Sequence, residues 1–267
     1  MSHDCFYLQE GAERYVPTGA TAGPWSGELQ HAGPPSALLA RAAVRHAEGS
    51  GLRLSSIACD VLGPLPLEPM QLSVTTVRPG RRVRLVHVSA SIAGCEALVL
   101  RAWLTAPAPS ELAATSSGPA EPAPPLPDPD DAAGIDALIP AAHTAGYLSA
   151  VEARFTAGGF GVPGPAQAWM RPLVPLVDEE PMTAWDRTLV VADSGSGISL
   201  AASPAVVPAI NCDLRVALHR EPRGEWVHLS STTRIEPGAG GLATTRLRDG
   251  AGEIGAATQT LAVSAPA

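Results

Sequence analysis

A proline-rich stretch near the middle of the chain divides the sequence into two halves with similar patterns. Residues 106–129 read APAPSELAATSSGPAEPAPPLPDP and contain almost no large apolar side chain. Such a segment cannot bury a core and is typical of an extended linker. Because 267 residues are enough for two ordinary domains, we predict a first domain over 1–110, a linker over 111–135 and a second domain over 136–267.

The same order of elements is predicted on each side of the linker. Residues 34–46 favour a helix, because helix formers follow two prolines that suit a first turn. Residues 180–193 favour a second helix, with a proline near its start and glycines past its end. Four segments with strand-like composition follow each helix. They are 54–62, 70–78, 82–93 and 97–105 in the first half, and 210–219, 225–235, 241–248 and 255–263 in the second.

Two short similarities between the halves support an internal duplication. IACDV at 57–61 resembles INCDL at 210–214, and residues 71–80 parallel 227–238. Similarities that keep their order and separation favour internal repetition. The sequence therefore predicts an α+β fold made of two tandem helix-plus-antiparallel-sheet repeats joined side by side.

Composition limits the classes of partner and compartment. Hydrophobic residues make up 45% and charged residues 16% of the chain, so a disordered protein is excluded. The net charge of -8 argues against nucleic acid, although a few arginines suffice to hold an anionic ligand such as coenzyme A. Without a signal-like start or an apolar run of about 20 residues, we expect a cytoplasmic protein that does not enter the membrane. The four cysteines are scattered, which predicts buried free thiols and no metal site.

Short motifs before and after the linker connect the chain to a known family. They are GPW at 23–25, QHAGPP at 30–35, AD at 192–193, NCDL at 211–214 and ATQ at 257–259. With these motifs the sequence resembles the TesB-like acyl-CoA thioesterase superfamily, and more narrowly its actinobacterial thioesterase family proteins. The resemblance implies a double hotdog fold and hydrolysis of an acyl-CoA to free acid and coenzyme A, with no cofactor. It also implies a role in fatty acid metabolism, and we expect a homodimer, because relatives often pair.

The same resemblance implies three catalytic residues in the second half. In the family an Asp, a Thr or Ser, and a Gln bind the hydrolytic water, and these positions fall on Asp193, Asn211 and Gln259. Asn211 departs from the pattern, because an amide donates and accepts hydrogen bonds but has no hydroxyl. Thioester hydrolysis needs a base and groups that fix the water, so Asp193 is expected to be the base. The first half has Ala58 in place of Asn211, and Trp103 or a neighbour in place of Gln259.

Three further residues are candidates for contact with the substrate. His31 lies in the loop before the first helix, and the backbone N–H of Gly33 is an oxyanion donor by analogy with other hotdog enzymes. Arg82 belongs to a group of arginines at one turn that suits phosphates.

Five of these six residues also have a purely structural explanation. Asp193 can be an exposed helix end, Asn211 a satisfied strand residue and Gln259 an outward-facing one. His31 can simply fix its loop, and Arg82 can belong to a solvated hairpin.

Two other functions stay open. A non-catalytic acyl-thioester or lipid binding protein on the same fold is favoured by the missing hydroxyl at Asn211. A hotdog hydratase needs a paired Asp and His on one turn, a spacing that we do not find in the sequence.

Overall fold

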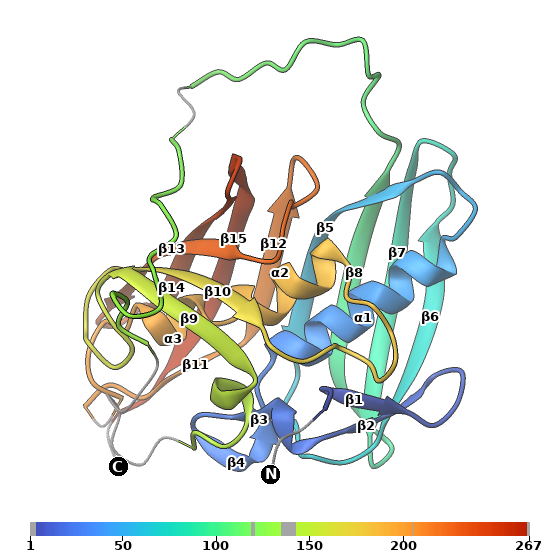
Figure 1. Ribbon diagram of the computed structural model, residues 1–267. Coiled ribbons are helices and arrows are strands. Elements are labelled where there is room, and N and C mark those ends of the chain that lie inside the picture. Colours follow the sequence, from blue (N-terminus) through green and yellow to red (C-terminus); the bar gives the residue numbers. More distant parts are fainter. Residues whose placement is uncertain (1–3, 119–120, 135–142, 205, 266–267) are drawn as a thin grey trace.

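One antiparallel sheet runs through the whole protein. The computed structural model describes residues 4–118, 121–134, 143–204 and 206–265. The strand order is β1-β2-β6-β7-β8-β5-β12-β15-β14-β13-β10-β9, with β11 also paired to β15. Figure 1 shows the two longer helices, α1 and α2, on the same side of this sheet, and they pack against each other. The expected α+β architecture of two repeats joined side by side is confirmed.

The helices and strands have the following bounds. The first half contains β1 (Tyr7–Gln9), β2 (Arg14–Pro17), η1 (Gly19–Thr21), β3 (Ala22–Gly23), β4 (Ser26–Gln30), α1 (Gly33–His46), β5 (Arg53–Val61), β6 (Met70–Arg78), β7 (Val83–Ile92) and β8 (Cys95–Thr105). The second half contains η2 (Tyr147–Ser149), β9 (Val151–Ala157), β10 (Ala166–Pro172), α2 (Ala184–Ala192), α3 (Gly195–Ile198), β11 (Ala209–Asn211), β12 (Asp213–Leu218), β13 (Val227–Glu236), β14 (Gly240–Asp249) and β15 (Gly252–Val263). The sequence pattern missed the outer strands β1, β2, β9 and β10, and the small β3-β4 sheet. None of the helices in the described ranges is long and apolar enough to cross a membrane.

Two differences between the predicted and the observed elements have a clear local cause. The second helix begins at Ala184 rather than at residue 180, because Thr183 caps it. The Thr183 hydroxyl accepts the Asp186 N–H at 3.1 Å, and the Asp186 carboxylate accepts the Thr183 N–H at 2.8 Å. The strand predicted over 210–219 is interrupted at Cys212, which separates β11 from β12.

The two halves join through the ladder between β5 and β12. Asp60 lies opposite Asp213 in this ladder. Arg215 offsets the repulsion between the two carboxylates, because it donates to Asp213 at 2.8 Å and lies 3.4 Å from Asp60. The Asp213 carboxylate also accepts the Thr260 N–H at 2.6 Å. The repeated Cys-Asp pairs, at 59–60 and 212–213, therefore belong to the junction between the two halves.

The connection between the halves contains no helix or strand among its described residues. β8 ends at Thr105, and residues 107–118 are exposed. The later part is fixed to the second half: Glu121 pairs with Arg248 at 2.8 Å, and the Pro124 carbonyl accepts the Trp169 indole N–H at 3.2 Å. In Figure 1 this green segment arches away from β8 and returns to the second half.

The cysteines are free, but only two of them are buried. Cys5 and Cys59 lie in the interior, whereas Cys95 and Cys212 are exposed. The prediction that all four are buried is thus wrong for two positions, because Cys95 follows a hairpin turn and Cys212 lies at the interruption between β11 and β12.

A buried histidine makes the stability of the second half depend on pH. His228 in β13 is fully buried beside Trp169, and neither ring nitrogen has a hydrogen-bond partner among the described groups. Burial, with the Arg248 charge, lowers its pKa from 6.5 to about 4. The unfolded chain therefore binds this proton at a higher pH than the folded chain does. We therefore expect the stabilisation from neutral His228 to be complete above about pH 6.5 and to fall by about 3 kcal/mol as the pH drops toward 4.

We expect the variant His228→Phe to lose less stability on acidification than the parent. The phenyl ring keeps the contact with Trp169 and carries no titratable group. Urea unfolding at pH 7 and pH 5 measures the difference. Equal losses in the two proteins would show that His228 does not carry the effect.

Candidate active site

An apolar cavity lies where the two halves meet at the helix ends. It has a volume of about 450 Å³ and is lined by residues of both halves. Its apolar lining includes Leu29, Val61, Leu62 and Leu65 from the first half and Leu148, Phe160, Met170, Ile198 and Ile210 from the second. A smaller cavity of about 220 Å³ adjoins it and shares Trp25, Ser196, Gly197, Ile210 and Asn211. A ligand with an apolar chain fits such a lining.

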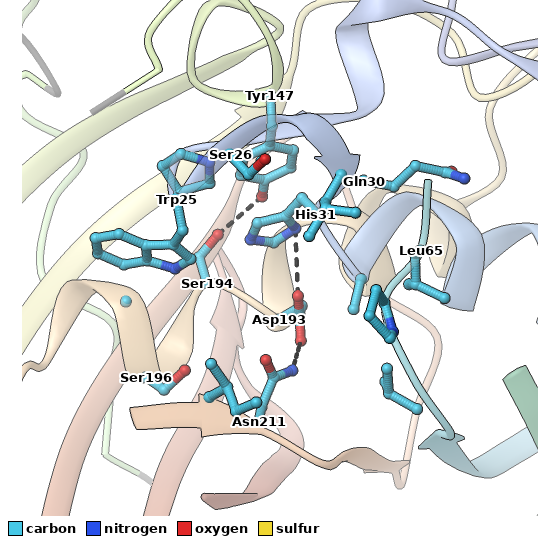
Figure 2. A pocket seen from close by; sticks show the side chains of 18 of the residues that line it. Trp25, Ser26, Gln30, His31, Leu65, Tyr147, Asp193, Ser194, Ser196 and Asn211 are labelled. Atoms are coloured by element: carbon cyan, nitrogen blue, oxygen red, sulfur yellow. Dashed lines mark hydrogen bonds and ion pairs between the residues drawn. The ribbon is translucent and has the colours of Figure 1, made fainter. Parts of the chain in front are cut away.

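Of the three residues predicted to be catalytic, Asp193 and Asn211 line this cavity, and Gln259 lies outside the lining and is bonded to Asp193. Asp193 caps the C-terminal end of α2 and is 5% exposed. Its Oδ1 accepts the Asn211 side-chain N–H at 2.7 Å and the Gln259 side-chain N–H at 3.0 Å. Figure 2 shows the Asp193 carboxylate between Asn211 and His31. Asp193 is therefore a buried site carboxylate and not an exposed helix end.

Gln259 uses both ends of its amide within the protein. Its nitrogen donates to the Asp193 carbonyl at 2.9 Å as well as to the carboxylate, and its oxygen accepts the Ser196 N–H at 2.9 Å. The side chain is 1% exposed and points inward. Gln259 thus fixes Asp193 and the start of α3. Asn211 gives one N–H to Asp193 and keeps its oxygen and its second N–H for other partners.

The first half has an apolar residue at the position equivalent to Gln259. The β7-β8 hairpin of the first half corresponds to the β14-β15 hairpin of the second. Ile92 pairs with Cys95 at the first turn, and Asp249 pairs with Gly252 at the second, so Cys95 and Gly252 are equivalent positions. Seven residues further along each strand lie Ala102 and Gln259. Ala102, next to the predicted Trp103, is fully buried. Only the second half carries the polar set.

His31 brings the first half into the site. Its Nδ1 lies 3.2 Å from Asp193 Oδ2, and its ring stacks on Tyr147 with 3.7 Å between centroids and 2° between planes. Burial lowers the pKa of His31, and the Asp193 charge partly opposes this shift. Burial raises the pKa of Asp193, and the His31 charge and the hydrogen bonds from Gln259 and Asn211 partly oppose that shift. When Asp193 is ionised it can only accept, and the proton of neutral His31 then lies on Nδ1. Nε2 then carries a free lone pair.

Gly33 lets the two helix ends approach closely. A Cβ at Gly33 would overlap the Val190 carbonyl at the end of α2. The Gly33 N–H faces His31 Nδ1 at 3.2 Å and also stabilises the Asp193 carboxylate. When Asp193 is ionised and accepts the Nδ1 proton of His31, this N–H can donate only to Asp193. Pro34 and Pro35 lack N–H groups, so Gly33 is the first-turn residue that can donate.

Arg82 lies away from this cavity. It is exposed and precedes Val83. Val83 and Arg53 both lie opposite Thr105 of β8, so Arg82 lies near the Arg53 end of β5. Val61, which lines the cavity, is at the other end of β5. The eight-residue separation corresponds to roughly 25 Å along the strand. The structure therefore does not bring Arg82 to the site. It adds Tyr147 and Ser194, whose hydroxyls lie 2.8 Å apart at the cavity and which the sequence did not single out.

This architecture, with two helices on one side of two sheets joined edge to edge, is a double hotdog. Residues 21–105 match the acyl-CoA thioesterase N-terminal domain, and residues 119–263 match the acyl-CoA thioesterase C-terminal domain. The chain belongs to this TesB-like acyl-CoA thioesterase family, whose members are thioester hydrolases.

Solved structures share this fold at low sequence identity. A protein assigned as a thioesterase from Novosphingobium aromaticivorans is 21% identical with a TM-score of 0.71, over 96% of this chain and 97% of that one. A hot dog fold protein of unknown function from Alicyclobacillus acidocaldarius is 15% identical with a TM-score of 0.74, over 100% of both chains. Acyl-CoA thioesterase II TesB2 from Mycobacterium marinum is 18% identical with a TM-score of 0.66, over 98% and 96%. No curated protein sequence matches the chain.

Proposed function

We propose that the protein hydrolyses an acyl-CoA to a free acid and coenzyme A, with the acyl chain in the apolar cavity. The observation that carries this proposal is the buried His31–Asp193 pair at the wall of that cavity. Family membership supports the thioester substrate.

The hydrogen bonds around Asp193 favour His31 as the base. Donors from Asn211, Gln259, His31 and Gly33 match the roughly four acceptor sites of a carboxylate. Asp193 then orients His31, and His31 Nε2 accepts the proton of the attacking water, as in other Asp-His pairs. This differs from the expectation that Asp193 is itself the base.

The reaction then needs no covalent intermediate. The water oxygen bonds to the thioester carbon as its proton passes to Nε2, and the carbon–sulfur bond breaks as the carbonyl reforms. The imidazolium returns the proton to the departing coenzyme A thiolate. Asn211 keeps an oxygen and an N–H for the water or the carbonyl.

A thiol-release assay over acyl-CoAs from short to long chain tests this function. We expect release of one thiol for each acid formed, with faster turnover for chains that fill the apolar cavity. A protein that binds acyl-CoA and the matching thioether analogue equally well but releases no thiol would instead be an acyl-thioester binding protein.

The same pair supports hydration of an enoyl thioester as a second candidate. The sequence lacks the Asp-His spacing of a hydratase, but the fold brings His31 and Asp193 together from different halves. Loss of enoyl absorbance without thiol release would favour the hydratase.

A further inference from the structure

Two hydroxyl groups that the mechanism above does not use meet at the wall of the cavity. Tyr147 begins the first turn of the second half, and Ser194 follows Asp193 directly. Their side-chain oxygens lie 2.8 Å apart, and both side chains are largely buried, at 1% and 6% exposure. Figure 2 shows the pair beside His31, on the side of its second ring nitrogen.

The direction of the hydrogen bond between them follows from the end of α2. The Val190 carbonyl lies in the last turn of α2. The Ser194 N–H, which would bond to it in a continuing helix, donates to the Val191 carbonyl instead. The Tyr147 hydroxyl donates to this carbonyl at 2.9 Å. Because a phenol has a single proton, Ser194 must donate to Tyr147. The lone pairs of Ser194 are then left to accept a hydrogen bond in the cavity.

An attacking water needs an acceptor of this kind. One of its protons passes to the base, and the other must be held so that the oxygen lone pair points at the thioester carbon. Asn211 carries no hydroxyl, whereas Ser194 places one beside Asp193.

We propose that Ser194 is a further catalytic residue, whose hydroxyl accepts the second proton of the attacking water, and that Tyr147 is the residue that positions it. This proposal rests on the proposed function. The water forms its bond to the carbon and loses one proton to His31, while the proton facing Ser194 stays on the product acid. Ser194 forms no covalent bond.

A double-mutant cycle with Ser194→Ala and Tyr147→Phe tests the proposal. We expect Ser194→Ala to lower kcat about tenfold or more, with KM and the affinity for a thioether analogue of acyl-CoA unchanged. Tyr147→Phe keeps the ring stacked on His31 and should lower kcat less. The double variant should be no slower than Ser194→Ala, because Tyr147 acts through Ser194. Circular dichroism and analogue binding confirm that each variant folds.

Three results would overturn the role of Ser194. They are an unchanged kcat in Ser194→Ala, losses that multiply in the double variant, and an acyl group on Ser194 detected by mass spectrometry with a slow substrate. In each case the parent still releases thiol and the proposed function stands. A parent that releases no thiol from any acyl-CoA would remove the proposed function, and this role with it.

Discussion

Replacing Asp193 by asparagine should lower the rate of thiol release by a factor on the order of 10² to 10⁴. The amide has nearly the same volume, so the cavity and the end of α2 should persist. It presents an N–H or a neutral oxygen to His31 Nδ1 and therefore no longer fixes the proton there or stabilises the imidazolium. Steady-state kinetics and analogue binding should show a lower kcat with little change in affinity.

Asp213→Asn is the matched control for this variant. Asp213 is also a buried carboxylate of the second half, but its partners are Arg215 and the Thr260 N–H at the junction. Its loss should lower the melting temperature and leave kcat within a few-fold of the parent. Equal kcat in the parent and in Asp193→Asn would rule out a catalytic role for Asp193 and favour the binding-protein alternative.

Replacing His31 by asparagine should cost as much activity as replacing Asp193, again on the order of 10² to 10⁴. Asparagine can still donate toward Asp193 from the position of Nδ1, but it has nothing at the position of Nε2 to take the proton. Because the two residues act as one unit, the double variant should be little slower than either single variant.

His46→Asn is the control for this change, because His46 lies at the other end of α1 and bonds Thr76 at the surface. It should behave like the parent. The competing mechanism, in which Asp193 takes the proton directly, predicts a small loss in His31→Asn beside a large one in Asp193→Asn. The ratio of the two losses therefore decides which group is the base.

The elements with strong local signals could be predicted from the sequence. The first helix is expected over 34–46 and is Gly33–His46, and the second strand segment is expected over 70–78 and is Met70–Arg78. Both have composition and periodicity that decide the conformation locally. The outer strands β1 and β2 have only three and four residues, too few for a periodic pattern.

The site could be predicted only where the resemblance reached it. Asp193, Asn211 and Gln259 were found by matching positions, and the structure brings them within hydrogen-bond distance. The pairing of His31 with Asp193 joins residues from separate halves, and no local spacing reports such a contact. Tyr147 follows a segment without regular pattern, so its ring gave no sign that it stacks on His31. Arg82 was selected for its charge, but charge alone does not indicate at which end of a strand a side chain lies.

The buried Ala102 predicts how many ligands one chain binds. A symmetric pair of identical hotdog subunits would contain each site residue twice. Here the counterpart of Gln259 is Ala102, whose methyl group packs in the interior. Isothermal titration with a thioether analogue should therefore saturate at one ligand per 27.3 kDa chain. A single polar set per chain is what duplication, fusion and the loss of one of two polar sets would leave. The first half then supplies His31 and its own wall of the cavity to the single remaining site.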